Sequence, residues 1–226
     1  MSKGLDVAIH FLLLASAILC WLLNRRKLNF RYVYYCALFL IVNFVFDGIA
    51  AFILLTGYLD SNLFLNHILT PIQLVLILMI YYHVLNNQTY KRIVLWLIPL
   101  FVIMSICLSF TIQPFTEMNT YSILIKHVIV IISTLTYFFE LMSTTPYSKV
   151  YLQPIFWISV GLLFHSSLNV LLEGFSNYLN TYSETKDSLI ILLYSVSNYC
   201  LFFLIGTGLV IPSAKSVIHG AASHSK

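Results

Sequence analysis

The sequence has very few charged side chains. Asp, Glu, Lys and Arg together make up 9% of its 226 residues, whereas hydrophobic residues make up 60%, and the mean hydropathy is +0.90. A soluble domain needs a polar surface around its core, and this composition does not supply one. We therefore predict an integral membrane protein, for which the lipid bilayer is the first partner.

Cysteine motifs and the short motifs of common catalytic sites are also missing. The four cysteines show no Cys-x-x-Cys spacing, so neither a disulfide framework nor a zinc site is expected. The sequence has no His-x-x-x-His pair, no Gly-x-Ser-x-Gly turn and no glycine-rich phosphate loop. The net charge of +4 requires no nucleic-acid partner, because basic loops are typical of the cytoplasmic face of membrane proteins.

Seven long apolar stretches fill most of the chain. A helix needs about 20 mostly apolar residues to cross a bilayer, and its backbone must be hydrogen-bonded internally. The predicted spans are residues 5–23, 32–57, 66–85, 93–110, 121–142, 154–173 and 189–212. This pattern predicts an all-α polytopic membrane protein, with a single seven-transmembrane-helix bundle over residues 1–212 and a short cytoplasmic tail over residues 213–226.

The Lys and Arg residues are concentrated on one predicted side of the membrane. Nine of the twelve fall there, and the remaining three fall on or near the other side. Because basic residues are enriched in cytoplasmic loops, this bias places the N-terminus outside and the C-terminus in the cytoplasm. The odd number of spans agrees with that orientation.

Polar side chains inside the predicted spans lie at similar depths. An ionisable residue at mid-span costs about 2.5–3.5 kcal/mol on insertion scales, so such residues usually face the bundle interior. Asn43 and Asp47 are four residues apart, as are His165 and Asn169, and this spacing places each pair on one helix face. At about 1.5 Å per residue, most of the set falls in the outer half of the membrane. The predicted ligand-binding residues are Asn43, Asp47, His67, Gln73, Lys126, His127, His165, Asn169, Glu173 and Asn198.

The inner half of the spans is mainly aromatic and aliphatic, so the polar set predicts a pocket that is open to the outside and closed toward the cytoplasm. Structural roles are the alternative. A single amide such as Asn169 links helices for about 0.6 kcal/mol on average, and a boundary residue such as Glu173 reaches the headgroups. Asp47 lies too deep for that, so its structural alternative is a hydrogen bond or a buried ion pair, for which Lys126 or His127 is a reasonable partner.

No cofactor is predicted. Residues 193–200, in the middle of the last span, contain no lysine, which excludes a retinal Schiff base at that position. The histidines His10, His67, His127 and His165 are numerous enough for haem or a divalent metal, but they would have to converge from different spans.

Three sequence blocks resemble a known group of proteins. They are Tyr-Tyr-His-Val-Leu at residues 81–85, Tyr-Phe-Phe-Glu-Leu-Met at 137–142, and Pro-Ile-Phe-Trp-Ile-Ser-Val-Gly-Leu-Leu-Phe at 154–164. They resemble an uncharacterised family of small seven-span inner membrane proteins common in Bacteroidota. The resemblance implies a multi-pass protein of a bacterial inner (plasma) membrane with the same architecture. That family has no established activity, so the resemblance assigns no residue a role.

Three functions fit these observations. The first is a receptor-like sensor that binds a small ligand in the outer pocket and signals through a separate cytoplasmic partner, contacted by Glu140, residues 144–152 and residues 213–226. The second is a transporter or channel, including a pore between subunits of a homo-oligomer, which would need polar residues through the inner half. The third is a membrane enzyme or redox subunit that uses metal, haem or quinone. The apolar inner half favours the sensor.

Overall fold

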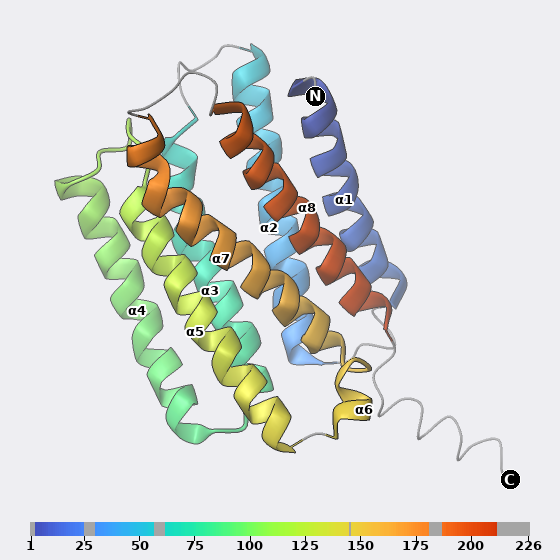
Figure 1. Ribbon diagram of the computed structural model, residues 1–226. Helices are drawn as coiled ribbons and strands as arrows, with labels where there is room; N and C mark the ends of the chain where they lie inside the picture. The colour runs from blue at the N-terminus through green and yellow to red at the C-terminus, as the bar shows by residue number, and fades with distance from the viewer. Residues whose placement is uncertain (1–2, 25–29, 57–61, 145, 181–186, 212–226) are drawn as a thin grey trace, which may run out of the picture.

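A computed structural model describes residues 3–24, 30–56, 62–144, 146–180 and 187–211, and Figure 1 shows the arrangement of its helices. Within these ranges all regular secondary structure is helical, as predicted. The elements are α1 (Lys3–Asn24), α2 (Arg31–Thr56), α3 (Phe64–Val84), α4 (Gln88–Thr111), α5 (Thr120–Thr144), α6 (Tyr147–Val150), α7 (Pro154–Asn180) and α8 (Asp187–Val210).

The described helices have the length and surface of membrane spans. Six of them, α2, α3, α4, α5, α7 and α8, contain a segment long and apolar enough to cross a bilayer, and α1 adds a shorter apolar segment over Ala8–Asn24. Large apolar side chains cover the outside, with Leu55, Phe139 and Trp96 each more than three quarters exposed. Such a surface suits lipid rather than water. The chain is therefore a multi-pass helical membrane protein, while a seventh crossing by α1 and the orientation of the termini remain predictions.

Several helix ends differ from the apolar stretches. Helix α4 begins at Gln88 rather than at residue 93, because the Asn87 side chain accepts hydrogen bonds from the backbone N–H groups of Thr89 and Tyr90 at 2.9 and 3.3 Å. Helix α7 continues to Asn180, beyond the predicted end at residue 173. Hydropathy reports where a helix enters lipid, whereas capping and backbone hydrogen bonds decide where it ends. The predicted tail, residues 213–226, lies outside the described residues.

The long helices alternate in direction along the bundle (Figure 1). The first residues of α1, α3, α5 and α8 lie at the end drawn uppermost, together with the last residues of α2, α4 and α7. We refer to this as the upper end and to the opposite one as the lower end. The start of α1 and the end of α8 therefore lie at opposite ends, as an odd number of crossings requires.

Six helices form a closed ring. Contacts join α1 to α2, α2 to α3, α3 to α5, α5 to α7, α7 to α8, and α8 back to α1. Helix α4 lies outside this ring, against α3 and α5 (Figure 1). Side chains that point inward from the six ring helices therefore meet one another, whereas those of α4 do not reach the interior.

The lower half of the ring is closely packed. Tyr81 of α3 is fully buried, and its hydroxyl lies 2.7 Å from the Thr134 hydroxyl of α5 and 3.2 Å from that of Ser159 on α7. At Gly208 of α8, a Cβ atom would lie 2.6 Å from the carbonyl oxygen of Pro154, so only glycine permits this approach to α7. The lower half thus joins α3, α5 and α7 by hydrogen bonds and α7 to α8 by a close approach at Gly208.

Candidate functional site

A cavity of about 190 Å³ lies inside the ring in its upper half. All six ring helices contribute polar side chains to it, and none comes from α4. We refer to it as the upper cavity; its polar lining residues are His10, Asn43, Asp47, Asn66, Thr70, Gln73, Lys126, His127, His165, Asn169, Glu173, Tyr194 and Asn198.

Nine of the ten residues predicted from the sequence line the upper cavity. They are Asn43, Asp47, Gln73, Lys126, His127, His165, Asn169, Glu173 and Asn198. Asp47 and His165, the two deep ionisable groups, face the same space from α2 and α7. The structure therefore brings these residues together, and their role in binding a ligand remains a prediction.

His67 is placed elsewhere, and its assignment to the pocket is wrong. Its Nε2 lies 3.0 Å from the Glu117 carbonyl oxygen and its Nδ1 lies 2.8 Å from the Ser109 hydroxyl of α4. A carbonyl oxygen only accepts, so Nε2 donates to it, and the Ser109 hydroxyl itself donates to the Ser105 carbonyl at 2.9 Å. The residues of α3 that line the cavity are Asn66, Leu69, Thr70 and Gln73. His67 is rotated about 100° away from Asn66 around the helix.

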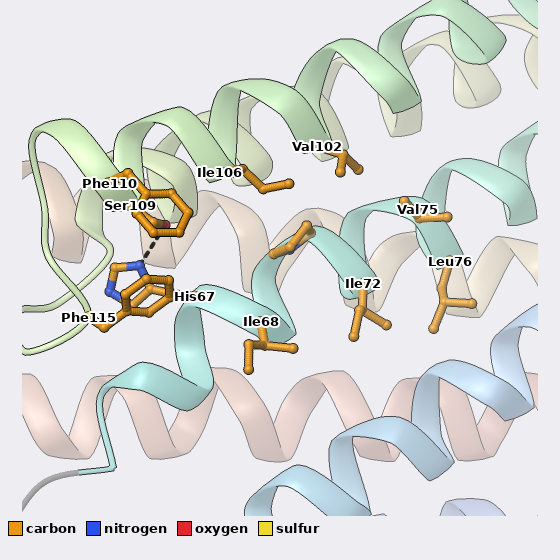
Figure 2. A pocket seen from close by; sticks show the side chains of 11 residues that line it. His67, Ile68, Ile72, Val75, Leu76, Val102, Ile106, Ser109, Phe110 and Phe115 are labelled. Carbon is orange, nitrogen blue, oxygen red and sulfur yellow. Dashed lines mark hydrogen bonds between the residues drawn. The ribbon is translucent and has the colours of Figure 1, made fainter.

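His67 instead borders a second hollow, an apolar groove of about 430 Å³ between α3 and α4. Figure 2 shows Ile72 and Val75 of α3 and Val102 and Ile106 of α4 around this space, with His67 and Ser109 hydrogen-bonded at one end. Ile106 is half exposed on the outside of the bundle. In a bilayer this groove faces acyl chains, and the two polar groups at its end satisfy each other.

The expected partner of Asp47 is also wrong. Its Oδ2 lies 2.8 Å from Nε2 of His10 on α1, rather than beside Lys126 or His127. Helix α2 packs against α1 and α3, whereas Lys126 and His127 are on α5 across the ring. The spacing of residues within one helix predicts which face of α2 carries Asp47, but it does not predict which helix packs against that face.

A row of hydrogen bonds crosses the cavity wall from α5 to α2. The Lys126 ammonium donates to Oε1 of Gln73 at 2.7 Å, and Nε2 of Gln73 donates to Oδ1 of Asn43 at 2.7 Å. Nδ2 of Asn43 donates in turn to the Phe39 carbonyl at 2.7 Å. Because an ammonium only donates, it determines the orientation of both amides along the row.

A second set of contacts joins α7 to α8. His165 Nδ1 lies 2.9 Å from the Ser197 hydroxyl, and Asn169 Nδ2 donates to the same hydroxyl at 3.1 Å. One turn higher, the Tyr194 hydroxyl donates to Oε1 of Glu173 at 2.7 Å. These bonds hold the two helices together along the cavity at the heights of His165 and Glu173.

Helices α5 and α7 meet through their histidines. His127 Nδ1 lies 3.3 Å from the Ser166 hydroxyl, and the His127 and His165 rings make an edge contact with centroids 5.3 Å apart. Among the residues described, no group of three or more His, Cys, Asp or Glu side chains is placed to hold a metal ion. The expectation that the protein has no cofactor remains a prediction.

The upper cavity contains charges of both signs. Lys126 is 7% exposed and Glu173 is 4% exposed, and the two interact electrostatically. Such buried charges are tolerated in a protein interior only when they are compensated. The carboxylate of Asp47 is compensated by His10. Each carboxylate of the cavity thus has a basic group near it, Lys126 for Glu173 and His10 for Asp47.

Apolar side chains form the floor of the cavity. A hollow of about 40 Å³ continues below it, and the lower wall of that hollow is lined by Phe39, Ile77, Val130, Leu162 and Leu201. Below these lies the buried contact of Tyr81 with Thr134 and Ser159. The polar lining thus belongs to the upper half.

Some cavity residues were not among those selected from the sequence. Tyr194 lies four residues before Asn198 on α8, and Asn66 and Thr70 precede Gln73 with helical spacing on α3. The same spacing rule that selected Asn43 and Asp47 would have found them. His10 gave a weaker signal, because only the packing of α1 against α2 pairs it with Asp47.

Comparison with protein-family models, with curated proteins and with solved structures found no match to the chain. These comparisons give no support to the resemblance to the Bacteroidota membrane proteins, which remains a hypothesis. The function is therefore argued from the geometry of the upper cavity.

Proposed function

We propose that the protein is a receptor-like sensor of a bacterial plasma membrane, with seven transmembrane helices and its N-terminus outside. A small polar ligand binds in the upper cavity from the outer side, and a separate cytoplasmic partner reads the change. One observation carries this proposal. Six helices direct polar side chains into one cavity at a single end of the ring, while apolar side chains and the Tyr81 contact fill the other end.

Helix α5 offers a route from ligand to partner. It carries Lys126 and His127 at the cavity, and its lower end carries Glu140. Oε1 of Glu140 accepts hydrogen bonds from the backbone and the side chain of Asn86, at 2.9 and 2.8 Å. A displacement of α5 on ligand binding would change this contact, which lies next to the short helix α6. Such a displacement requires that the ligand bind the two positions of α5 with different affinity.

Thiol labelling tests the access to the cavity. In a variant with Cys20, Cys36, Cys107 and Cys200 replaced by Ala, single cysteines are introduced as Asn198→Cys in the upper cavity and, as a control, Ser159→Cys in the lower half. A membrane-impermeant thiol reagent added to intact cells should label the first variant and not the second. Labelling of Asn198→Cys only in inside-out vesicles would reverse the orientation and contradict an outward receptor.

Flux measurement separates a sensor from a transporter. The purified protein is reconstituted in liposomes and supplied with radiolabelled compounds that slow the labelling of the cavity cysteine. We expect binding without accumulation inside the liposomes, because the polar lining ends at the apolar floor. Time-dependent uptake above that of protein-free liposomes would contradict the sensor and indicate a transporter.

A further inference from the structure

The upper cavity has unused hydrogen-bond donors near its base. An ammonium has three N–H donors, and Lys126 gives one of them, to Gln73, within the described residues. The side-chain amide of Asn198 also lines the cavity and makes no hydrogen bond with any described residue. A ligand anion placed between these two groups would receive hydrogen bonds from both α5 and α8.

An unused acceptor lies higher in the same cavity. Oδ2 of Asp47 meets His10, whereas Oδ1 has no hydrogen-bond partner among the residues described. Asp47 lies one turn above Asn43, a rise of about 6 Å, and Asn43 belongs to the hydrogen-bonded row of Gln73 and Lys126. The open acceptor thus lies above the open donors by roughly the length of a very small molecule.

The balance of charge restricts the ligand further. Two carboxylates, Asp47 and Glu173, line the cavity together with the Lys126 ammonium and with His10, which pairs with Asp47. A ligand with only a negative charge would face two carboxylates, and one with only a positive charge would face Lys126 without compensating it. Burying a charge without compensation is costly, so a ligand with both charges and no net charge fits this lining best.

The volume of the cavity suits a small ligand. A volume of about 190 Å³ corresponds to the order of six water molecules, at about 30 Å³ each. We infer that the upper cavity binds a small zwitterion of the α-amino acid type, with its carboxylate at Lys126 and Asn198 and its ammonium toward Asp47. The inference rests on the proposed function and names the class of its ligand.

Isothermal titration of the full-length protein in nanodiscs tests the inference. The probes are glycine, L-alanine and L-serine, together with propionate, which lacks the ammonium, and ethylamine, which lacks the carboxylate. We expect at least one of the three zwitterions to bind at least tenfold more tightly than either analogue. If propionate, ethylamine or the uncharged polyol glycerol bound as tightly as the zwitterions, the inference of a zwitterionic ligand would be wrong.

Variants locate the two ends of the ligand. Lys126→Met should weaken binding of the zwitterion at least tenfold without weakening the binding of ethylamine. Asp47→Asn should likewise weaken binding of the zwitterion at least tenfold without weakening the binding of propionate. Lys149→Met, at an exposed lysine of the lower end, is the matched control and should bind normally. Unchanged affinity for the zwitterion in folded Lys126→Met or Asp47→Asn would contradict the assigned position of the ligand. If Lys126→Met does not fold, the affinities of the wild-type protein for the zwitterions and their analogues still test the class of ligand.

Failure of the inference is distinguishable from failure of the proposed function. If Asn198→Cys is labelled from outside but glycerol or propionate binds more tightly than the zwitterions, the outward-facing cavity is supported and the zwitterionic ligand is contradicted. If Asn198→Cys is not labelled from outside and none of the probes binds, the proposed function falls and the inference falls with it.

Discussion

In the upper half of the ring, Lys126, Gln73 and Asn43 form a hydrogen-bonded row along a cavity of about 190 Å³. In the lower half, Tyr81 is fully buried and its hydroxyl contacts Thr134 and Ser159 among apolar side chains. Both sets of polar groups join helices across the bundle. The upper set also retains open donors and acceptors that face a space, whereas the Tyr81 hydroxyl has two partners and is enclosed.

This difference separates a polar site from polar packing inside a membrane protein. A polar side chain within a span is not by itself evidence of a binding site, because interhelical hydrogen bonds alone explain many such residues. A space beside the side chain and unused hydrogen-bonding capacity are the further observations that point to a ligand. The following variants test whether the two halves differ in this way.

The largest loss of stability is expected for Gln73→Leu. The substitution removes the acceptor of Lys126 and the donor to Asn43, and leaves a buried ammonium without its hydrogen bond. We expect the free energy of unfolding to fall by about 3 kcal/mol, measured by denaturation in mixed micelles. Gln88→Leu, at an exposed residue of α4, is the control and should change it by less than about 0.5 kcal/mol. Equal losses would show that the row contributes no stability.

The next largest effect is expected for Gly208→Ala in the lower half. The new Cβ would lie 2.6 Å from the Pro154 carbonyl oxygen and 3.0 Å from Ile158, so α7 and α8 must move apart. A loss of about 2 kcal/mol is expected from such overpacking. At Gly206 the added Cβ would lie 3.8 Å from Ala17, which is ordinary contact, so Gly206→Ala should melt like the wild type. The prediction fails if both variants melt alike.

Removal of the Tyr81 hydroxyl should have a smaller effect. Tyr81→Phe loses two hydrogen bonds, with an expected loss of about 1 kcal/mol. The Tyr137 hydroxyl is buried without a partner among the described residues, so Tyr137→Phe should leave the free energy of unfolding unchanged or raise it. A greater loss in Tyr137→Phe than in Tyr81→Phe would contradict the account of the lower half.

The smallest effect is expected for the pair of His10 and Asp47. A double-mutant cycle with His10→Ala and Asp47→Ala should give a coupling of about 0.6 kcal/mol, the average for interhelical hydrogen bonds in membranes. Both side chains are partly exposed, at 21% and 32%, which limits the coupling. The matching cycle of Asp47 with Lys126 should give a coupling near zero. A larger value there would restore the ion pair expected from the sequence.

Much of the fold was predictable because hydropathy has a simple cause. Residues such as those of α2 and α5 form apolar runs long enough to cross a bilayer, and helices of that kind satisfy their own backbone. Helical spacing then selected Asn43 with Asp47 and His165 with Asn169, all of which line one cavity. The error at His67 has an equally simple cause, since one residue along α3 turns a side chain from the cavity to the groove against α4.

The sequence by itself determined that the chain is helical, membrane-embedded and polar at one depth, because these properties depend on composition and on the period of the helix. Only the tertiary structure decided the order of helices around the ring, the exclusion of α4 and the pairing of Asp47 with His10. Those features depend on which helices are neighbours. Contacts between residues distant along the chain set that choice, and no local pattern of residues encodes it.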